Sequence, residues 1–164
     1  MDAEQLAALP DVDVEKMQGQ KLKAYSVYKQ DASIKAGQQR YKQILIVDLT
    51  NMQLANFHGK KGKALAKIFS MGSTYYPESM WKIYLVNTPM IFRAVWSMVK
   101  AWLHPITVNK IQIVGSASEA IKLMNMHHIP TSAIPKWLGG ECEGKSTYDY
   151  IQEELVTKKR PLGS

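Results

Sequence analysis

The stretch that decides the fold runs from Lys82 to Val114, KIYLVNTPMIFRAVWSMVKAWLHPITVNKIQIV. It opens with an apolar run at residues 82–86, continues into a longer segment at residues 91–103 and ends in a second apolar run at residues 110–114. Short apolar runs rich in β-branched residues are typical of buried strands, and the middle segment has the length of a helix. A strand, a helix and a second strand predict a right-handed crossover between parallel strands.

The same alternation continues on both sides of this unit. The run Ile44–Val47 predicts another buried strand of a parallel sheet. Helices are expected over residues 13–36, 60–74 and 117–126. The sequence therefore predicts an α/β fold with helices flanking the sheet.

Two of these helices carry recognisable end residues. Gly37 is expected to stop the first helix, and Ser116 to cap the third. Helical spacing predicts that the first helix turns one stripe inward, made of Val14, Met17, Tyr25, Tyr28 and Ala32.

The segment at residues 91–103 is unusually apolar for a surface helix. Arg93, Ser97 and Lys100 form a narrow polar stripe, and the remaining apolar arc is roughly 220° wide, about twice what a surface helix needs. Such a helix is either buried under a neighbouring segment, or it lines a lipid cavity or dips aromatic side chains into a membrane interface. Periodicity alone leaves both interpretations open.

Composition narrows the class of protein. The 164 residues and 18.5 kDa suit one domain, and the net charge of +7 favours acidic partners such as phospholipid headgroups, anionic membrane or nucleic acid. Cys142 is the sole cysteine, which excludes an intrachain disulfide and fits a reducing, intracellular setting. No segment approaches the ~18 apolar residues of a membrane span, so any membrane contact is expected to be peripheral.

Catalytic and metal-binding motifs are not found. The segment HGKKGKA at residues 58–64 lacks the spacing of a phosphate-binding loop. His127 and His128 are adjacent and predict a helix-ending pair, not a metal site. Asp48 ends a predicted strand without an identifiable catalytic partner. We therefore expect no enzyme, no metal and no cofactor, and nucleic-acid binding is not favoured because the lysines are spread along the chain.

Five segments, YYPE, KIYLVNTPMIF, VWSMVKAWL, PITVNKI and IPKWLGG, occur in the order and spacing of one family. Through them the chain resembles the CRAL-TRIO family of lipid-binding and phosphatidylinositol-transfer proteins over residues 40–143. Together these motifs are specific for the family, whereas no single one of them would identify it.

The resemblance implies a mixed sheet that forms the floor of an apolar lipid pocket, closed by a mobile gate helix that meets the membrane during exchange. Residues 91–103 occupy the gate position. The gate and membrane-contact residues implied in this way are Phe92, Val95, Trp96, Val99, Trp102 and Leu103.

The resemblance also implies a headgroup site. In phosphatidylinositol-binding members the inositol phosphate is held by residues that match Glu78, Thr107 and Lys110 here. A lysine suits phosphate, a threonine adds a hydroxyl, and a carboxylate accepts hydrogen bonds from sugar hydroxyls. The alternative is that Lys110 merely precedes a strand and Glu78 pairs with a nearby lysine.

The chain departs from the family pattern in three places. Gln43 and Leu45 stand where phosphatidylcholine-binding members carry small hydroxyl residues, so a choline-lipid site is not expected. His104 stands where an acidic residue often precedes the proline. The family's N-terminal lobe and first floor strand have no counterpart, which makes the chain resemble an N-terminally truncated relative.

The expected organisation is a helical segment over residues 1–42, a lipid-binding core over residues 43–145 and a tail over residues 146–164. Because a missing edge strand leaves unpaired backbone, residues 1–42 are expected to cover that edge, or two chains to pair across it as a homodimer.

The function expected from the sequence is binding and transfer or presentation of a phospholipid, namely phosphatidylinositol or a phosphoinositide, without catalysis. The partners would be the lipid and an anionic membrane surface, with the protein cytoplasmic and transiently membrane-associated. The alternative is a protein-interaction or signalling module of the same family that transfers no lipid.

Overall fold

The computed structural model describes residues 11–50, 53, 78–101, 103–144, 149 and 153. The helix expected over residues 60–74 lies outside the described residues. The described elements, in chain order, are α2 (Asp11–Ala36), β1 (Gln43–Asp48), β2 (Met80–Val86), α4 (Phe92–Ala101), α5 (Pro105–Val108), β3 (Ile111–Ile113), α6 (Ala117–Met126), and the 3₁₀ turns η2 (Thr131–Ala133) and η3 (Lys136–Leu138).

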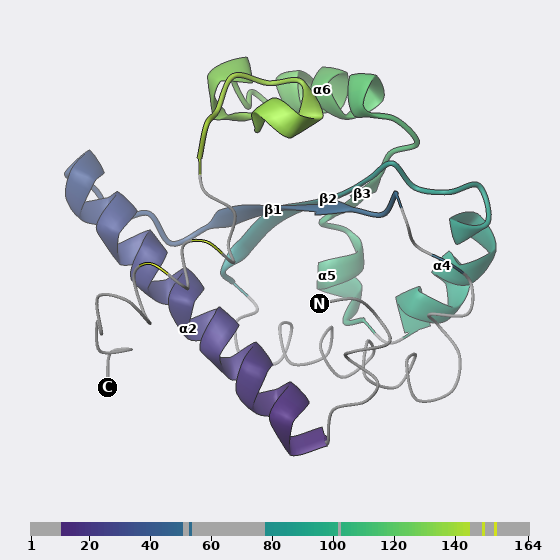
Figure 1. The fold of residues 1–164 in the computed structure, drawn as a ribbon, viewed down its shortest axis with the longest axis horizontal. Helices are drawn as coiled ribbons and strands as arrows, with labels where there is room; N and C mark the ends of the chain where they lie inside the picture. Colours follow the sequence, from purple (N-terminus) through teal and green to yellow (C-terminus); the bar gives the residue numbers. More distant parts are fainter. Residues whose placement is uncertain are drawn as a thin grey trace.

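The centre of the fold is a three-stranded sheet in the order β1-β2-β3 (Figure 1). Both pairings are parallel, with Ile46 opposite Tyr84 and Leu85 opposite Ile113. All three strands lie where the apolar runs predicted them. The resemblance implied a mixed sheet, but the part of the sheet that the structure describes contains parallel strands throughout.

One face of the sheet is covered by α6, most completely at β2. Tyr84 and Val86 of β2 point to this face and pack with Ala120 and Met124 of α6. The side chains of Tyr84 and Val86 are 0% exposed. The helix has the predicted bounds, and Ser116 caps it by accepting a hydrogen bond from the Glu119 backbone N–H at 3.3 Å, as expected.

The opposite face carries α4 and α5 (Figure 1). Its buried residues come from both the sheet and α4 and form a second apolar cluster of Leu49, Leu85, Phe92, Val95, Val99 and Leu103. Side chains that alternate along a strand sort into these two clusters, because neighbouring residues point to opposite faces.

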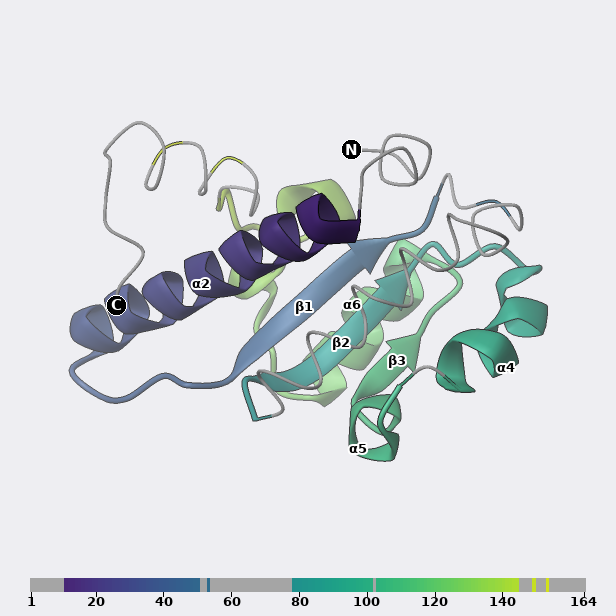
Figure 2. The same ribbon diagram turned by 90° about the horizontal axis from the view of Figure 1, so that it is seen from below.

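Helix α2 runs alongside β1, on the side of the sheet away from β3 (Figure 2). It ends at Ala36, and Gly37 follows with φ 60°, so the glycine stop was correctly predicted. The predicted inward stripe is wrong in part, because Tyr28 is 57% exposed whereas Gln18, Leu22 and Ala24 are buried. A tyrosine ring can stay at the surface because its hydroxyl keeps its contact with water.

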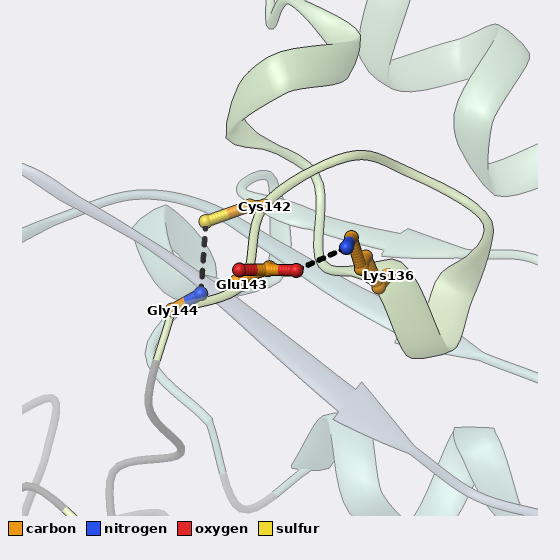
Figure 3. A network of polar contacts seen from close by, with 4 residues as sticks. All are labelled: Lys136, Cys142, Glu143 and Gly144. Carbon is orange, nitrogen blue, oxygen red and sulfur yellow. Dashed lines mark hydrogen bonds and ion pairs between the residues drawn. The ribbon is translucent and has the colours of Figure 1, made fainter.

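A compact turn after α6 closes the described chain. Gly140 lies against the Ile134 carbonyl oxygen so closely that a Cβ there would come within 2.1 Å of it, which accounts for a glycine at this position. An ion pair between Lys136 and Glu143 and a hydrogen bond from the Gly144 N–H to Cys142 Sγ at 3.3 Å hold the end of this turn (Figure 3). Cys142 thus has a structural role, because its sulfur accepts a backbone hydrogen bond in this turn.

Candidate functional site

The candidate site lies at the amino-terminal end of the sheet. Glu78 stands two residues before β2, and Lys110 immediately precedes β3. Because β2 and β3 are parallel neighbours, their starts share one edge of the sheet. Thr107 reaches the same edge from α5, which leads directly into β3. The topology therefore brings the three predicted headgroup residues to one end of the sheet.

Helix α5 fixes the spacing between Thr107 and Lys110. The Lys110 N–H donates to the Thr107 carbonyl oxygen at 3.0 Å, and the Lys110 carbonyl oxygen accepts from the Ile83 N–H at 2.9 Å. Lys110 is thereby tied to α5 on one side and to β2 on the other.

His104 caps this short helix. Its backbone is extended, and its Nδ1 accepts a hydrogen bond from the Ile106 N–H at 3.3 Å, while Pro105 occupies the first helical position. An acidic residue before a proline would accept the same hydrogen bond. The departure at His104 therefore preserves the turn that positions Thr107.

The three residues are accessible to a ligand. Glu78 is exposed, and Thr107 and Lys110 are half-buried. The alternative that Glu78 pairs with a nearby lysine stays open, because the lysines of residues 60–67 lie outside the described residues.

The gate residues implied by the resemblance lie mostly on the inner side of α4, and their membrane contact remains a prediction. Phe92, Val95, Val99 and Leu103 are buried, and Trp96 is half-buried beside Phe92, with 6.0 Å between the ring centroids. Helical periodicity puts these residues on the face that meets the sheet, so in this conformation they contact the protein interior and not a membrane. Trp102 lies outside the described residues.

The outer side of α4 and the turn before it is where apolar side chains reach the surface. Met90 is 90% exposed, Ile91 48% and Met98 37%, with Ala94 exposed between them. We call these four residues the outer α4 patch. The wide apolar arc predicted for residues 91–103 thus includes exposed residues beyond Phe92, Val95, Trp96 and Val99, which lie on its inner half.

Both faces of the sheet are covered unevenly. On the α6 face Tyr84 and Val86 are fully buried, but Ile46 is half-buried and Ile44 is 39% exposed. On the α4 face Leu45, Val47 and Ile111 are half-buried, and Ile113 is 38% exposed. Parallel strands are normally buried on both faces, so the partial cover of the α4 face is a property that calls for a ligand or a further segment.

The carboxyl ends of β1 and β2 are joined by Asp48. Its Oδ1 accepts hydrogen bonds from the Thr50 hydroxyl at 2.6 Å and from Asn87 Nδ2 at 3.1 Å. The hydrogen bond from Thr50 is the main cause that lowers the pKa of Asp48. Asn87 sits at φ 53°, a conformation that asparagine tolerates. Asp48 thus has a structural role, because its carboxylate connects the ends of β1 and β2 through these hydrogen bonds.

His127 joins α6 to the sheet. The Tyr84 hydroxyl and His127 Nδ1 lie 2.6 Å apart. Burial, followed by the charges of Lys82 and His128, lowers the pKa of His127. His127 follows the last residue of α6 and His128 adopts φ 61°, so the helix-ending pair was correctly predicted. Among the described residues no cluster of His, Cys, Asp and Glu could hold a metal ion.

Comparison with known proteins identifies the family. A CRAL/TRIO domain model matches residues 7–140, and the chain therefore belongs to the CRAL-TRIO family. The match begins before α2, so this helix lies within the matched region.

Curated relatives match a shorter part of the chain. The SEC14 cytosolic factor of Yarrowia lipolytica is 35% identical over 100 residues, which cover 61% of this chain and 20% of that protein. The Sec14 cytosolic factor of Schizosaccharomyces pombe is 33% identical over 98 residues (60% of this chain, 33% of that protein). The phosphatidylinositol/phosphatidylcholine transfer protein SFH12 of Arabidopsis thaliana is 30% identical over 97 residues (59% and 17%). The matched regions thus span a third or less of these relatives.

A solved structure agrees with the fold. The crystal structure of Sfh5 superposes with a TM-score of 0.52 at 16% sequence identity, covering 73% of this chain and 44% of that one. None of the helices that the structure describes combines the length and apolarity needed to cross a bilayer.

The lowered pKa of His127 predicts a pH dependence of stability. Because His127 binds its proton more weakly in the folded chain, protonation favours the unfolded chain. The stabilisation that neutral His127 gives the folded chain is fully present above about pH 6.5, the usual histidine pKa. It is lost as the pH falls below this value. Urea unfolding at pH 7.5 and 5.5 should show a larger loss of stability for the natural chain than for His127→Gln.

His128→Asn is the matched control, because His128 is exposed and asparagine tolerates its positive φ. This variant should keep most of the pH dependence of the natural chain, because burial is the largest cause of the lowered pKa of His127 and the charge of His128 a smaller one. An equal loss of stability in His127→Gln and the natural chain would contradict the assignment.

Proposed function

We propose that this chain binds one phospholipid, phosphatidylinositol or a phosphoinositide, and carries or presents it to membranes without catalysing a reaction. The observation that carries the proposal is the pairing of two features of one sheet. Its α4 face is apolar and partly covered, and the segments that carry Glu78, Thr107 and Lys110 lead into β2 and β3 at its amino-terminal end. The first feature suits acyl chains and the second suits a headgroup.

Acyl chains would supply most of the binding free energy. Each CH₂ group transferred from water into an apolar environment contributes about 0.8 kcal/mol. Val47, Ile83 and Ile111 present half-buried aliphatic side chains next to the α4 cluster and offer such an environment. This contribution depends on chain length and not on the headgroup, so selectivity must come from elsewhere.

The headgroup residues would supply that selectivity. The Lys110 ammonium would bind the phosphate diester, the Thr107 hydroxyl would donate to the same phosphate, and the Glu78 carboxylate would accept hydrogen bonds from inositol hydroxyls. A choline headgroup offers no hydroxyls to Glu78. The proposal therefore favours inositol lipids over choline lipids.

Contact with the membrane would use charge and the outer α4 patch. A net charge of +7 attracts the chain to anionic bilayers. Met90, Ile91 and Met98 are exposed on the outer side of α4 and the turn before it and would enter the headgroup region of the bilayer. Movement of α4 away from the sheet would then open the apolar face to lipid, which is the gate role. The protein would be cytoplasmic and only transiently membrane-associated.

Loss of the headgroup contacts should abolish selective transfer. Lys110→Ala removes the cation and Thr107→Asp places a negative charge beside the phosphate, so each should lower the rate of phosphatidylinositol transfer between vesicles by about tenfold or more. Lys122→Ala removes a lysine with the same change of charge from the exposed side of α6 and should transfer at the natural rate.

Circular dichroism and unfolding of each variant would establish that the fold is kept. Transfer at the natural rate by both folded headgroup variants would contradict the headgroup assignment. Absence of transfer and of lipid binding by the natural chain would favour an interaction module instead.

The outer α4 patch should matter for membrane contact and not for folding. Met98→Glu places a charge where the patch would enter the bilayer, so the transfer rate should fall by about tenfold, the effect of failing to bury one large apolar side chain. Ser97→Glu adds the same charge at the neighbouring exposed position and should have a much smaller effect. Vesicle cosedimentation and transfer rates measure both, and equal effects of the two substitutions would contradict a specific membrane role for the patch.

A further inference from the structure

The connection between α2 and β1 is a hydrogen-bonded turn at the surface. Gly37 follows α2 with φ 60°, and its N–H donates to the Ile34 carbonyl oxygen at 3.3 Å. The Arg40 N–H then donates to the Ser33 hydroxyl at 2.7 Å. These two hydrogen bonds fold residues 37–40 back against the last turn of α2.

Positive charge gathers on this turn. The side chains of Lys35, Arg40 and Lys42 are exposed. Residues 32–47 carry these three cations and no acidic residue. The ion pairs among the residues that the structure describes do not include any of the three cations. Their charge can therefore act on a partner outside the chain.

Apolar side chains are exposed beside these cations. Ile34 is 71% exposed and Tyr41 is 55% exposed. The Lys42 ammonium lies 5.5 Å from the centroid of the Tyr41 ring, so a cation and an aromatic ring are held together. The surface made by Ile34, Lys35, Arg40, Tyr41 and Lys42 is called the α2–β1 surface below.

The neighbouring elements do not cancel this charge. The start of β1 lies beside the start of β2 (Figure 2), where Lys82 pairs with Ile44 and Glu78 is exposed. This cation and this carboxylate offset each other. In α2, Asp31 lies one turn before Lys35 and is half-buried. With all of these groups counted, the α2–β1 surface stays positive.

Cations beside an exposed tyrosine and an exposed isoleucine suit an anionic bilayer. Lysine and arginine are attracted to acidic lipids, tyrosine favours the level of the headgroups, and an aliphatic side chain gains by entering the acyl boundary. A nucleic acid would engage the cations but would leave Ile34 in water. An acidic protein could use both kinds of side chain, but a chain that exchanges a lipid has to meet a bilayer.

We infer that the α2–β1 surface docks the chain on anionic membranes. This inference rests on the proposed function for its choice of partner. It adds a second contact, based on charge, to the apolar contact proposed for the outer α4 patch. Membrane binding then depends on where the cations lie and not on the net charge alone.

The test is cosedimentation of the full chain with vesicles of phosphatidylcholine, either alone or mixed with phosphatidylserine. The natural chain should bind the anionic vesicles. The triple variant Lys35→Gln/Arg40→Gln/Lys42→Gln should bind them at least about tenfold more weakly, because each cation near an anionic surface adds to the affinity.

A second triple variant with the same net charge is the matched control. Lys16→Gln/Lys23→Gln/Lys122→Gln removes three exposed lysines from other parts of α2 and from α6, and it should bind like the natural chain. Equal losses in the two triple variants would show that only net charge matters and would overturn the docking surface.

The apolar part of the surface has its own matched pair. Ile34→Ser removes an aliphatic side chain that would enter the bilayer, so binding to the anionic vesicles should weaken. Met126→Ser changes a side chain of similar exposure, 74%, at the end of α6 and should have no effect. Equal effects of the two substitutions would contradict insertion of Ile34.

Loss of charge has to be separated from loss of fold and from a different partner. Lys35→Arg/Lys42→Arg keeps both charges and should bind like the natural chain, and urea unfolding checks the stability of each variant. Binding to polyglutamate but not to anionic vesicles would point to an acidic protein and would overturn the membrane as the partner.

Lipid uptake, scored by native mass spectrometry, distinguishes this inference from the proposed function. If the natural chain takes up no inositol phospholipid but the first triple variant loses vesicle binding, the proposed function fails and the docking surface stands. If lipid is taken up and the first triple variant binds vesicles like the natural chain, the proposed function stands and the docking surface is overturned.

Discussion

The parallel pairing of β2 with both its neighbours is the constraint on which the rest of the structure depends. Hydrogen bonds from Gln43 to Ser79 at 2.8 Å and from Ile83 to Lys110 at 2.9 Å fix the two ladders near their starts. Alternation along β2 then sends Tyr84 to the α6 face and Leu85 to the α4 face. The same pairing sets the strand starts side by side, which gives the apolar face a polar end. A lipid has the same division between tail and head.

Much of this arrangement is predictable from local sequence. The three apolar runs give the strands, and Ser116 and Gly37 mark helix ends, because strand burial and helix capping depend on residues close together in the chain. Which residues of α2 face the protein interior is not predictable in the same way. Tyr28 fits the apolar pattern but is exposed, whereas Gln18 is buried, because what surrounds a long helix is decided by distant segments.

Prediction of the candidate site from the sequence is limited in the same way, because contacts between distant segments decide part of it. The resemblance to the CRAL-TRIO family points to Glu78 and Lys110, and the parallel register brings their strand ends together. The contact between the Tyr84 hydroxyl and His127 is missed, because it depends on where α6 ends above the sheet. The outer residues of α4 are missed because a pattern apolar on nearly all sides does not say which side faces the sheet.

The central claim is that the partly covered face of the sheet and its polar end together hold one phospholipid. Native mass spectrometry of the protein, purified from cells without detergent, tests it most directly. The account predicts a population heavier than the 18.5 kDa chain by the mass of one inositol phospholipid, identified by fragmentation, and a loss of that population in Lys110→Ala. A natural chain found at its own mass alone, and still empty after incubation with phosphatidylinositol vesicles, would contradict it.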